Sequence, residues 1–195
     1  MRVVVATGNA GKLGELTSLL APLGVELVPQ AAYGVEPPPE TGTTFLANAL
    51  IKARHAARIT GLPAIADDSG LEVDALGGAP GVYSARYAGD ASDAAANNAK
   101  VLEVMAGVPP EKRHARFRAI IVFVRATDDP CPLVGEGVWE GRIALAPRGS
   151  GGFGFDPLFE PFDVVGTAAE LTPADKNARS HRGAALRALV AQWPP

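Results

Sequence analysis

Cysteine, long apolar runs and an excess of positive charge are scarce or missing in this 195-residue sequence. The single cysteine, Cys131, cannot form a disulfide within the chain, and we expect it to be a minor packing residue. No apolar run approaches the ~20 residues that span a bilayer. The N-terminal apolar run meets Thr7 and Asn9 too early for a signal peptide. These absences lead us to expect a cytoplasmic protein without a membrane partner.

The charge balance also narrows the class of ligand, because the formal net charge is −3. A broad basic surface for DNA or RNA is not expected, whereas a small anionic ligand needs only a few local cations. Hydrophobic residues make up 47% and charged residues 20%, as in a globular domain rather than a disordered chain. At this length we expect one domain, spanning residues 1–195.

Short β-rich runs and segments with helical spacing follow one another along the chain. The first pattern predicts strands at residues 3–6, 25–28, 64–66, 71–73, 116–124, 133–139 and 143–145. The second predicts helices at residues 12–24, 44–59, 93–105 and 178–193. Because the two kinds interleave without a repeat period, we expect an α/β fold with a mixed sheet whose last strands are antiparallel.

The first cluster of candidate functional residues lies between the first predicted strand and helix. It consists of Thr7, Gly8, Asn9, Ala10, Gly11 and Lys12. Glycines let the backbone approach a ligand, a helix N-terminus presents N–H groups, and Lys12 adds a cation, so the segment suits phosphate. The spacing is not that of a Walker A loop. An ordinary strand-to-helix turn with a solvated lysine explains the segment equally well.

The second cluster is Asp67-Asp68-Ser69-Gly70, which follows a short apolar strand. Two adjacent acids near a core need compensation, and Mg²⁺ would provide it, since it takes carboxylate and phosphate oxygens together. One acid could instead orient or deprotonate a water. Glu40, on a proline-rich loop, is a third candidate acid. The alternative is an acidic turn with its side chains in solvent.

The third cluster is a glycine-rich loop with two aromatic rings. It contains Phe153, Gly154, Phe155 and Asp156. Rings in an open loop can stack on a nucleobase. Alternatively, the two phenylalanines belong to the core, as we expect for Phe159 and Phe162.

The fourth cluster is Lys176 with Ser180-His181-Arg182, at the start of the last predicted helix. These side chains offer donors for phosphates or for a keto oxygen of a base. The alternative is helix capping by Ser180 with exposed basic residues. We treat His55 and His114 as structural or surface residues.

In sequence order, these motifs resemble those of the inosine triphosphate pyrophosphatase family over nearly the whole chain. The matching segments are Ala6-Thr7-Gly8-Asn9 with Lys12, Glu40 to Phe45, Ala66 to Leu71, Leu76 to Tyr87, Gly152 to Pro157 and Ser180 to Gly183. The resemblance implies an elongated α/β fold, with a mixed sheet flanked by helices and two lobes with a cleft between them, usually as a homodimer. It implies hydrolysis of non-standard purine nucleoside triphosphates (ITP, dITP, XTP) to the monophosphate and pyrophosphate.

The resemblance also implies roles for the candidate residues. Asp68 would activate water and contact Mg²⁺, with Glu40 as a second metal ligand, and Ser69 would contact substrate. The segment from Thr7 to Lys12 would hold the triphosphate. The base pocket and the remaining contacts would come from Phe153, Gly154, Phe155, Asp156, Lys176, His181 and Arg182, with Phe153 stacking on the base.

Two positions depart from the family pattern. Ala47 stands where a glutamate is usual, so the carboxylates would have to come from Glu40, Asp67 and Asp68. Phe155 stands where a tyrosine is usual, so one hydroxyl is missing while the ring remains. Two other functions stay open: a pyrophosphatase with a different base preference, and a sensor that binds a triphosphate without cleaving it.

Overall fold

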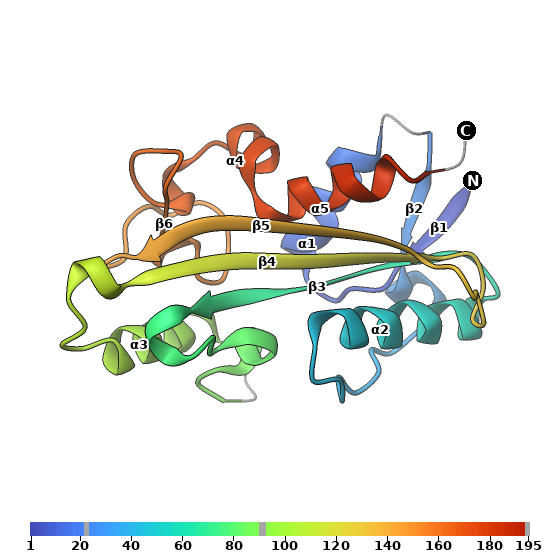
Figure 1. Ribbon diagram of the computed structural model, residues 1–195. Coiled ribbons are helices and arrows are strands. Elements are labelled where there is room, and N and C mark those ends of the chain that lie inside the picture. Colours follow the sequence, from blue (N-terminus) through green and yellow to red (C-terminus); the bar gives the residue numbers. More distant parts are fainter. Residues whose placement is uncertain (22–23, 90–92, 194–195) are drawn as a thin grey trace. The chain divides into compact units, whose positions relative to one another are not determined.

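The structure is a computed structural model that describes residues 1–21, 24–89 and 93–193 (Figure 1). The chain divides into two compact units, each with its own hydrophobic core. Unit 1 comprises Met1–Asp68, Ala119–Gly137 and Arg182–Pro195, and unit 2 comprises Ser69–Arg118 and Val138–His181.

Helices and strands alternate as the sequence patterns predicted. The strands are β1 (Arg2–Val5), β2 (Glu26–Pro29), β3 (Ala64–Val73), β4 (His114–Val124), β5 (Leu133–Ile143) and β6 (Phe159–Pro161). The α-helices are α1 (Ala10–Leu20), α2 (Phe45–Thr60), α3 (Ala94–Val104), α4 (Pro173–Arg179) and α5 (His181–Val190). Short 3₁₀-helices lie in the connections, among them η4 (Gly81–Arg86) and η7 (Ala168–Glu170).

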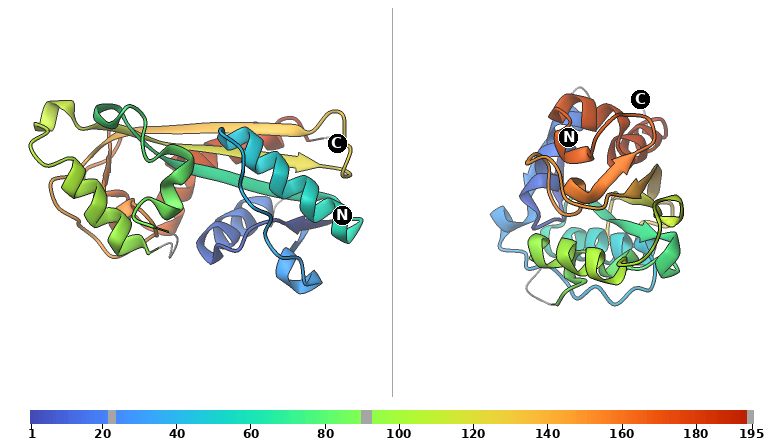
Figure 2. Two further views of the ribbon diagram at one scale, coloured as in Figure 1. Left: turned by 90° about the horizontal axis from the view of Figure 1, so that it is seen from below. Right: turned by 90° about the vertical axis from the view of Figure 1, so that its left-hand side faces the viewer.

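The six strands confirm the predicted mixed α/β fold. Their hydrogen-bonded order is β2-β1-β3-β4-β5-β6. β1 is parallel to β2 and β3, whereas β6 is antiparallel to β5. β4 and β5 lie side by side (Figure 1 and Figure 2). Strands β3, β4 and β5 each contribute residues to both units.

Unit 1 buries its part of the sheet on both faces. Residues 119–124 of β4 are buried without alternation, as expected for a strand covered from both sides. Alternate side chains of β4 join β1, α1 and α5 in one core, with members Val3, Val5, Leu16, Leu20, Ile65, Ala119, Ile121, Phe123, Ala185, Leu186 and Leu189. Helix α2, on the other side of the strands from α5 (Figure 1), buries Ala49, Ala53 and Ala56.

Unit 2 buries its part of the sheet on one face. Residues 114–118 of β4 alternate between exposed or half-buried and buried, which is the pattern of a strand with one polar face. The core on the apolar face includes Leu71, Val73, Val101, Met105, Phe117, Trp139, Ile143, Phe155, Leu158 and Phe159. On the polar side, Arg116 pairs with Asp74 and Glu140, and Arg118 pairs with Glu72.

Helix starts follow the capping residues that the sequence offers. Asn9, Thr44 and Asp93 each accept a backbone N–H bond at the start of α1, α2 and α3. Residues 44 and 93 are also where the second and third helices were predicted to begin. The predicted end of the first helix, near residue 24, includes residues 22–23, which lie outside the described residues. Among the described residues no helix is long and apolar enough to cross a membrane.

Several predicted boundaries are wrong. The segment Asp67-Asp68-Ser69-Gly70 is not a turn after a strand but the middle of β3, because its backbone continues the ladder. β5 is one strand rather than two short ones, and the last predicted helix is split at Ser180 into α4 and α5. Phe162 is 56% exposed and so is not a core residue.

Gly135 of β5 allows α5 to pack closely in unit 1. A Cβ at this position would lie 2.0 Å from the carbonyl oxygen of Ala185 and 2.9 Å from Cβ of Leu189. We therefore predict that Gly135→Ala forces α5 away from the strand and lowers the free energy of unfolding by about 1–3 kcal/mol. Urea denaturation measures the change.

Gly14→Ala is the matched control for this substitution. Gly14 is an exposed position of α1 where a Cβ would meet no atom within 4 Å. Alanine should stabilise that helix by up to about 1 kcal/mol. Equal denaturation midpoints for the two variants would contradict the packing argument.

Candidate functional site

Two adjacent carboxylates are buried in the middle of β3. Asp67 is 1% exposed and Asp68 is 6% exposed. Successive side chains of a strand point to opposite faces, so the two carboxylates enter different surroundings although they are neighbours in sequence. Each therefore requires its own compensating partners.

Asp67 is held by two cations from α1 and α5. The ammonium of Lys12 lies 2.5 Å from one carboxylate oxygen, and Nε of Arg182 donates to the other at 3.1 Å. Arg182, 2% exposed, also pairs with Glu15. Burial opposes ionisation of Asp67, but Arg182 and Lys12 outweigh it and hold the pKa of Asp67 well below its usual range. Burial also lowers the pKa of Lys12.

Asp68 shares a single cation with Glu40. The ammonium of Lys52, on α2, donates to Oδ1 of Asp68 at 2.6 Å and to Oε1 of Glu40 at 2.9 Å. Oδ2 of Asp68 is buried and has no hydrogen-bond partner among the described residues. Burial raises the pKa of Asp68, and the neighbouring Lys52 and Lys12 only partly offset that effect. Asp68 thus combines a raised proton affinity with an uncommitted oxygen.

Lys52 was not among the site residues predicted from the sequence. Burial alone would lower the pKa of Lys52, but Asp68 and Glu40 raise it above its usual value. A signal was available, because position 52 falls on the same helical stripe as Ala49, Ala53 and Ala56. A lysine within such a stripe is costly unless it is paired, and so it points to a buried acid.

The turn before α1 is open to solvent. Gly8, Asn9 and Ala10 are exposed, and Thr7 and Gly11 are half-buried. Asn9 caps the helix by accepting from the backbone N–H of Lys12 at 3.1 Å, and Thr7 accepts from the N–H of Asn9 at 3.1 Å. Because Lys12 pairs with Asp67, the alternative of a solvated lysine is wrong, while the exposed backbone remains accessible to an anion.

Unit 2 holds the aromatic loop together with Lys176. The ammonium of Lys176, on α4, lies 2.6 Å from Oδ2 of Asp156 and 4.5 Å from the centre of the Phe153 ring. The same oxygen of Asp156 accepts from the backbone N–H of Phe153 at 2.8 Å. A Cβ on Gly152 would lie 2.1 Å from this oxygen, so the turn requires glycine. Asp156 therefore fixes both Lys176 and Phe153.

The remaining candidates all lie in unit 2. Phe155 is 5% exposed and belongs to the core of unit 2, which favours the core alternative for this ring. His181, also in unit 2, is 4% exposed and stacks on Phe117 with ring centres 4.7 Å apart. Ser69 is half-buried in β3. Ser180 is the residue at which α4 ends.

The donor set of unit 1 fits a hard divalent cation. No group of three or more His, Cys, Asp or Glu side chains suited to a metal occurs in the described part of the chain. Glu40 and Asp68 nevertheless approach one another closely enough to share the Lys52 ammonium, and Asp68 keeps one buried oxygen uncommitted. Mg²⁺ takes one or two carboxylates together with substrate phosphate oxygens, which agrees with this pair.

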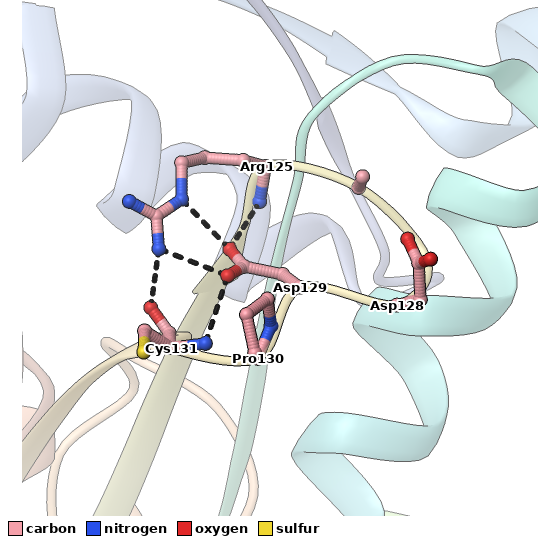
Figure 3. Close-up of a pocket in the computed structure, with 6 residues that line it drawn as sticks. Arg125, Asp128, Asp129, Pro130 and Cys131 are labelled. Atoms are coloured by element: carbon pink, nitrogen blue, oxygen red, sulfur yellow. Dashed lines mark hydrogen bonds and ion pairs between the residues drawn. The ribbon is translucent and has the colours of Figure 1, made fainter.

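A separate hollow of about 530 Å³ lies beside the β4–β5 turn of unit 1 (Figure 3). Asp129 accepts hydrogen bonds from the backbone and side chain of Arg125 and from the backbone N–H of Cys131. Hydrogen bonds from Arg125 lower the pKa of Asp129. Arg125 and Asp129 compensate each other's charge, so we assign the hollow to the structure of the β4–β5 turn. Cys131 is exposed, so its prediction as a packing residue is wrong.

The fold and the site define an α/β protein with buried acids paired to lysines in one strand and an exposed turn before the first helix. Sequence comparison makes the class specific. The chain belongs to the Ham1 family, whose model matches residues 3–192.

Individual relatives match over nearly their full length. A dITP/XTP pyrophosphatase of Thioalkalivibrio sulfidiphilus is 57% identical over 190 residues, which cover 97% of each chain. A dITP/XTP pyrophosphatase of Xanthomonas campestris is 60% identical over 188 residues, covering 96% of this chain and 94% of the relative.

Solved structures share the fold. A HAM1 protein from Coxiella burnetii superposes with a TM-score of 0.90 at 48% identity, covering 98% of both chains. A nucleoside-triphosphatase, or dITP/XTP pyrophosphatase, from Mycobacterium abscessus gives a TM-score of 0.77 at 47% identity over 100% of both chains. The family and the α/β fold implied by the sequence motifs are therefore confirmed.

The opposite pKa shifts of Asp67 and Asp68 predict opposite effects on stability. The ionised Asp67 stabilises the fold above its unfolded-state pKa of about 3.9, and this contribution is lost as the pH falls through its lower folded-state pKa. The ionised Asp68 is disfavoured in the folded state, so it reduces stability above its raised pKa.

We therefore predict that Asp67→Asn lowers the free energy of unfolding at pH 7 by about 3–5 kcal/mol, because two buried cations lose their counter-charge. Asp68→Asn should change it by less than about 1 kcal/mol, or raise it, since Lys52 keeps Glu40. Urea denaturation of the two isosteric variants tests this. A loss for Asp68→Asn as large as that for Asp67→Asn would contradict the assignment.

Proposed function

We propose that this protein hydrolyses non-standard purine nucleoside triphosphates, such as ITP, dITP and XTP, to the monophosphate and pyrophosphate. The observation that carries the proposal is the cluster of Asp68, Lys52 and Glu40, in which one buried carboxylate oxygen is uncommitted. The activity after which relatives at 57% and 60% identity are named supports the substrate class. Such an activity removes these nucleotides from the cellular pool.

Asp68 is the proposed general base. Its pKa is raised, so it accepts a proton more readily than an exposed carboxylate. Oδ2 would take the proton from a water molecule that attacks the α-phosphorus, while Lys52 holds Oδ1 and fixes the orientation of the group. Asp67 is unsuited to this role because Lys12 and Arg182 engage both of its oxygens.

Glu40 and Asp68 are the proposed ligands of Mg²⁺. When bound there, the ion would supply charge neutralisation at phosphate oxygens. The exposed turn from Thr7 through Gly8, Asn9, Ala10 and Gly11 to Lys12 would hold the triphosphate through backbone N–H groups at the start of α1.

Phe153 is the proposed stacking surface for the base. Its ring is half-buried, and its backbone is fixed by Asp156. Lys176, which Asp156 orients, is a donor suited to the 6-keto oxygen that distinguishes hypoxanthine and xanthine from adenine. Gly154, Ser69 and His181 complete the proposed set.

Two residues need a modified role. Phe155 lies in the core, so we assign its ring to the support of the loop rather than to stacking. Arg182 is engaged by Asp67 and Glu15. Its proposed role is therefore indirect: it holds Asp67 and this part of β3 in place rather than contacting the substrate. Assembly as a homodimer and location in the cytoplasm stay predictions.

Release of pyrophosphate tests both the activity and the role of Asp68. We expect Mg²⁺-dependent release from ITP and XTP, and much slower release from ATP and GTP. Asp68→Asn should lower kcat at least about 100-fold, because it removes the general base. Asp128→Asn, an exposed carboxylate in the β4–β5 turn, is the matched control and should keep full activity.

Three results would count against this proposal. Near-normal turnover by a folded Asp68→Asn variant would exclude Asp68 as the base. Equal rates on all four nucleotides would exclude the selectivity for non-standard purines. Binding of ITP without any release by the unmodified protein would favour a nucleotide sensor.

The stacking role of Phe153 predicts a change in KM. Phe153→Ala should raise KM for ITP about 5- to 150-fold, the equivalent of ~1–3 kcal/mol of stacking, with a smaller change in kcat. Phe162→Ala is the matched control, since Phe162 is an exposed phenylalanine of the same unit. An unchanged KM for Phe153→Ala would remove the ring from the base site.

A further inference from the structure

Two adjacent asparagines on α3 make different use of their side chains. Asn97 is 5% exposed, and both halves of its carboxamide are satisfied. Its Nδ2 donates to the carbonyl of Ala85 at 3.0 Å, and its Oδ1 accepts from the N–H of Ala88 at 2.7 Å. Asn97 therefore joins α3 to the segment around η4 and has a structural role.

Asn98 makes one hydrogen bond and leaves one buried atom unsatisfied. Its Nδ2 donates to the carbonyl of Gly154 at 2.9 Å, across 56 residues of sequence. Its Oδ1 is buried without a hydrogen-bond partner among the described residues. A buried acceptor without a partner lowers stability, and leucine is also a better helix former than asparagine. The bond to Gly154 is therefore what asparagine offers at this position and leucine does not.

The bond from Asn98 reaches the loop that carries Phe153. Gly154 has a φ of +62°, a left-handed conformation that favours glycine, and it stands between the half-buried Phe153 and the core residue Phe155. Asp156 holds the N–H of Phe153, and Asn98 holds the carbonyl of Gly154. The backbone is therefore fixed on both sides of the Phe153 side chain.

We propose that Asn98 is a positioning residue for the Phe153 loop and that it preorganises this ring for the base of the substrate. The proposal rests on the proposed function for its substrate, but the contact itself is independent of it. A loop that is fixed before binding does not lose that freedom when the ligand arrives, so binding is tighter. Asn98 thus acts on substrate affinity through Phe153 and not on the chemical step.

Asn98→Leu tests the proposal, with Asn97→Leu as the matched control on the same helix. In Asn98→Leu we expect Tm to stay the same or rise, because the unsatisfied oxygen is removed and water can reach the half-buried Gly154. Hydrogen exchange in peptides that cover residues 149–157 should become about tenfold faster, as expected for the loss of one hydrogen bond. KM for ITP should rise about tenfold, with kcat within about twofold.

Asn97→Leu should show a lowered Tm, because the buried Asn97 joins α3 to the segment around η4 through two hydrogen bonds that leucine cannot make. If Asn98→Leu lowers Tm to the same extent and leaves KM unchanged, Asn98 is merely structural and the proposal is overturned. Unchanged exchange at residues 149–157 would overturn it as well. If the unmodified protein releases no pyrophosphate but exchange still accelerates in Asn98→Leu, the proposed function fails while the positioning of the loop by Asn98 is supported.

Discussion

Burial of two consecutive carboxylates in one strand is the constraint on which unit 1 depends. The alternation of β3 sends Asp67 and Asp68 to different surroundings, so each needs a cation from a different helix. Lys12 of α1 and Arg182 of α5 serve Asp67, and Lys52 of α2 serves Asp68. These helices also cover the apolar strand residues of this unit. Charge compensation and core packing therefore hold them against the strands together.

The fold was predictable wherever local pattern and tertiary packing agree. Continuous apolar runs such as residues 119–124 predict a strand because such a strand is buried on both sides, and Thr44 and Asp93 stand at the predicted helix starts. The prediction failed at residues 67–70, where polar residues and glycine suggested a turn. Their burial depends on lysines and an arginine distant in sequence, which local pattern does not report.

The site was predictable as a set of clusters but not as a set of pairings. Spacing and family motifs indicated both acids of β3, the turn at Lys12 and the Phe153 loop. Lys52 was overlooked because a lysine in an alanine-rich helix suggests a solvated face. Only its spacing from the buried alanines of α2 shows that it lies on their face of the helix. Phe155 and Phe153 look equivalent in sequence, and only the core of unit 2 separates them. Asn98 has no sequence signal at all, since its partner is Gly154.

The two carboxylates of β3 differ in how completely their charges are compensated. Asp67 has a cation on each oxygen, which lowers its pKa and makes it a poor proton acceptor. Asp68 pairs with Lys52, but Lys52 also donates to Glu40, so its charge is shared between two carboxylates. The effect of burial on Asp68 therefore outweighs that of the cation and raises the pKa of Asp68. A second lysine or arginine on Asp68, as on Asp67, would occupy Oδ2, the oxygen that has no hydrogen-bond partner among the described residues. The sharing of Lys52 therefore holds Asp68 in place through Oδ1 and leaves Oδ2 for the proposed role as base.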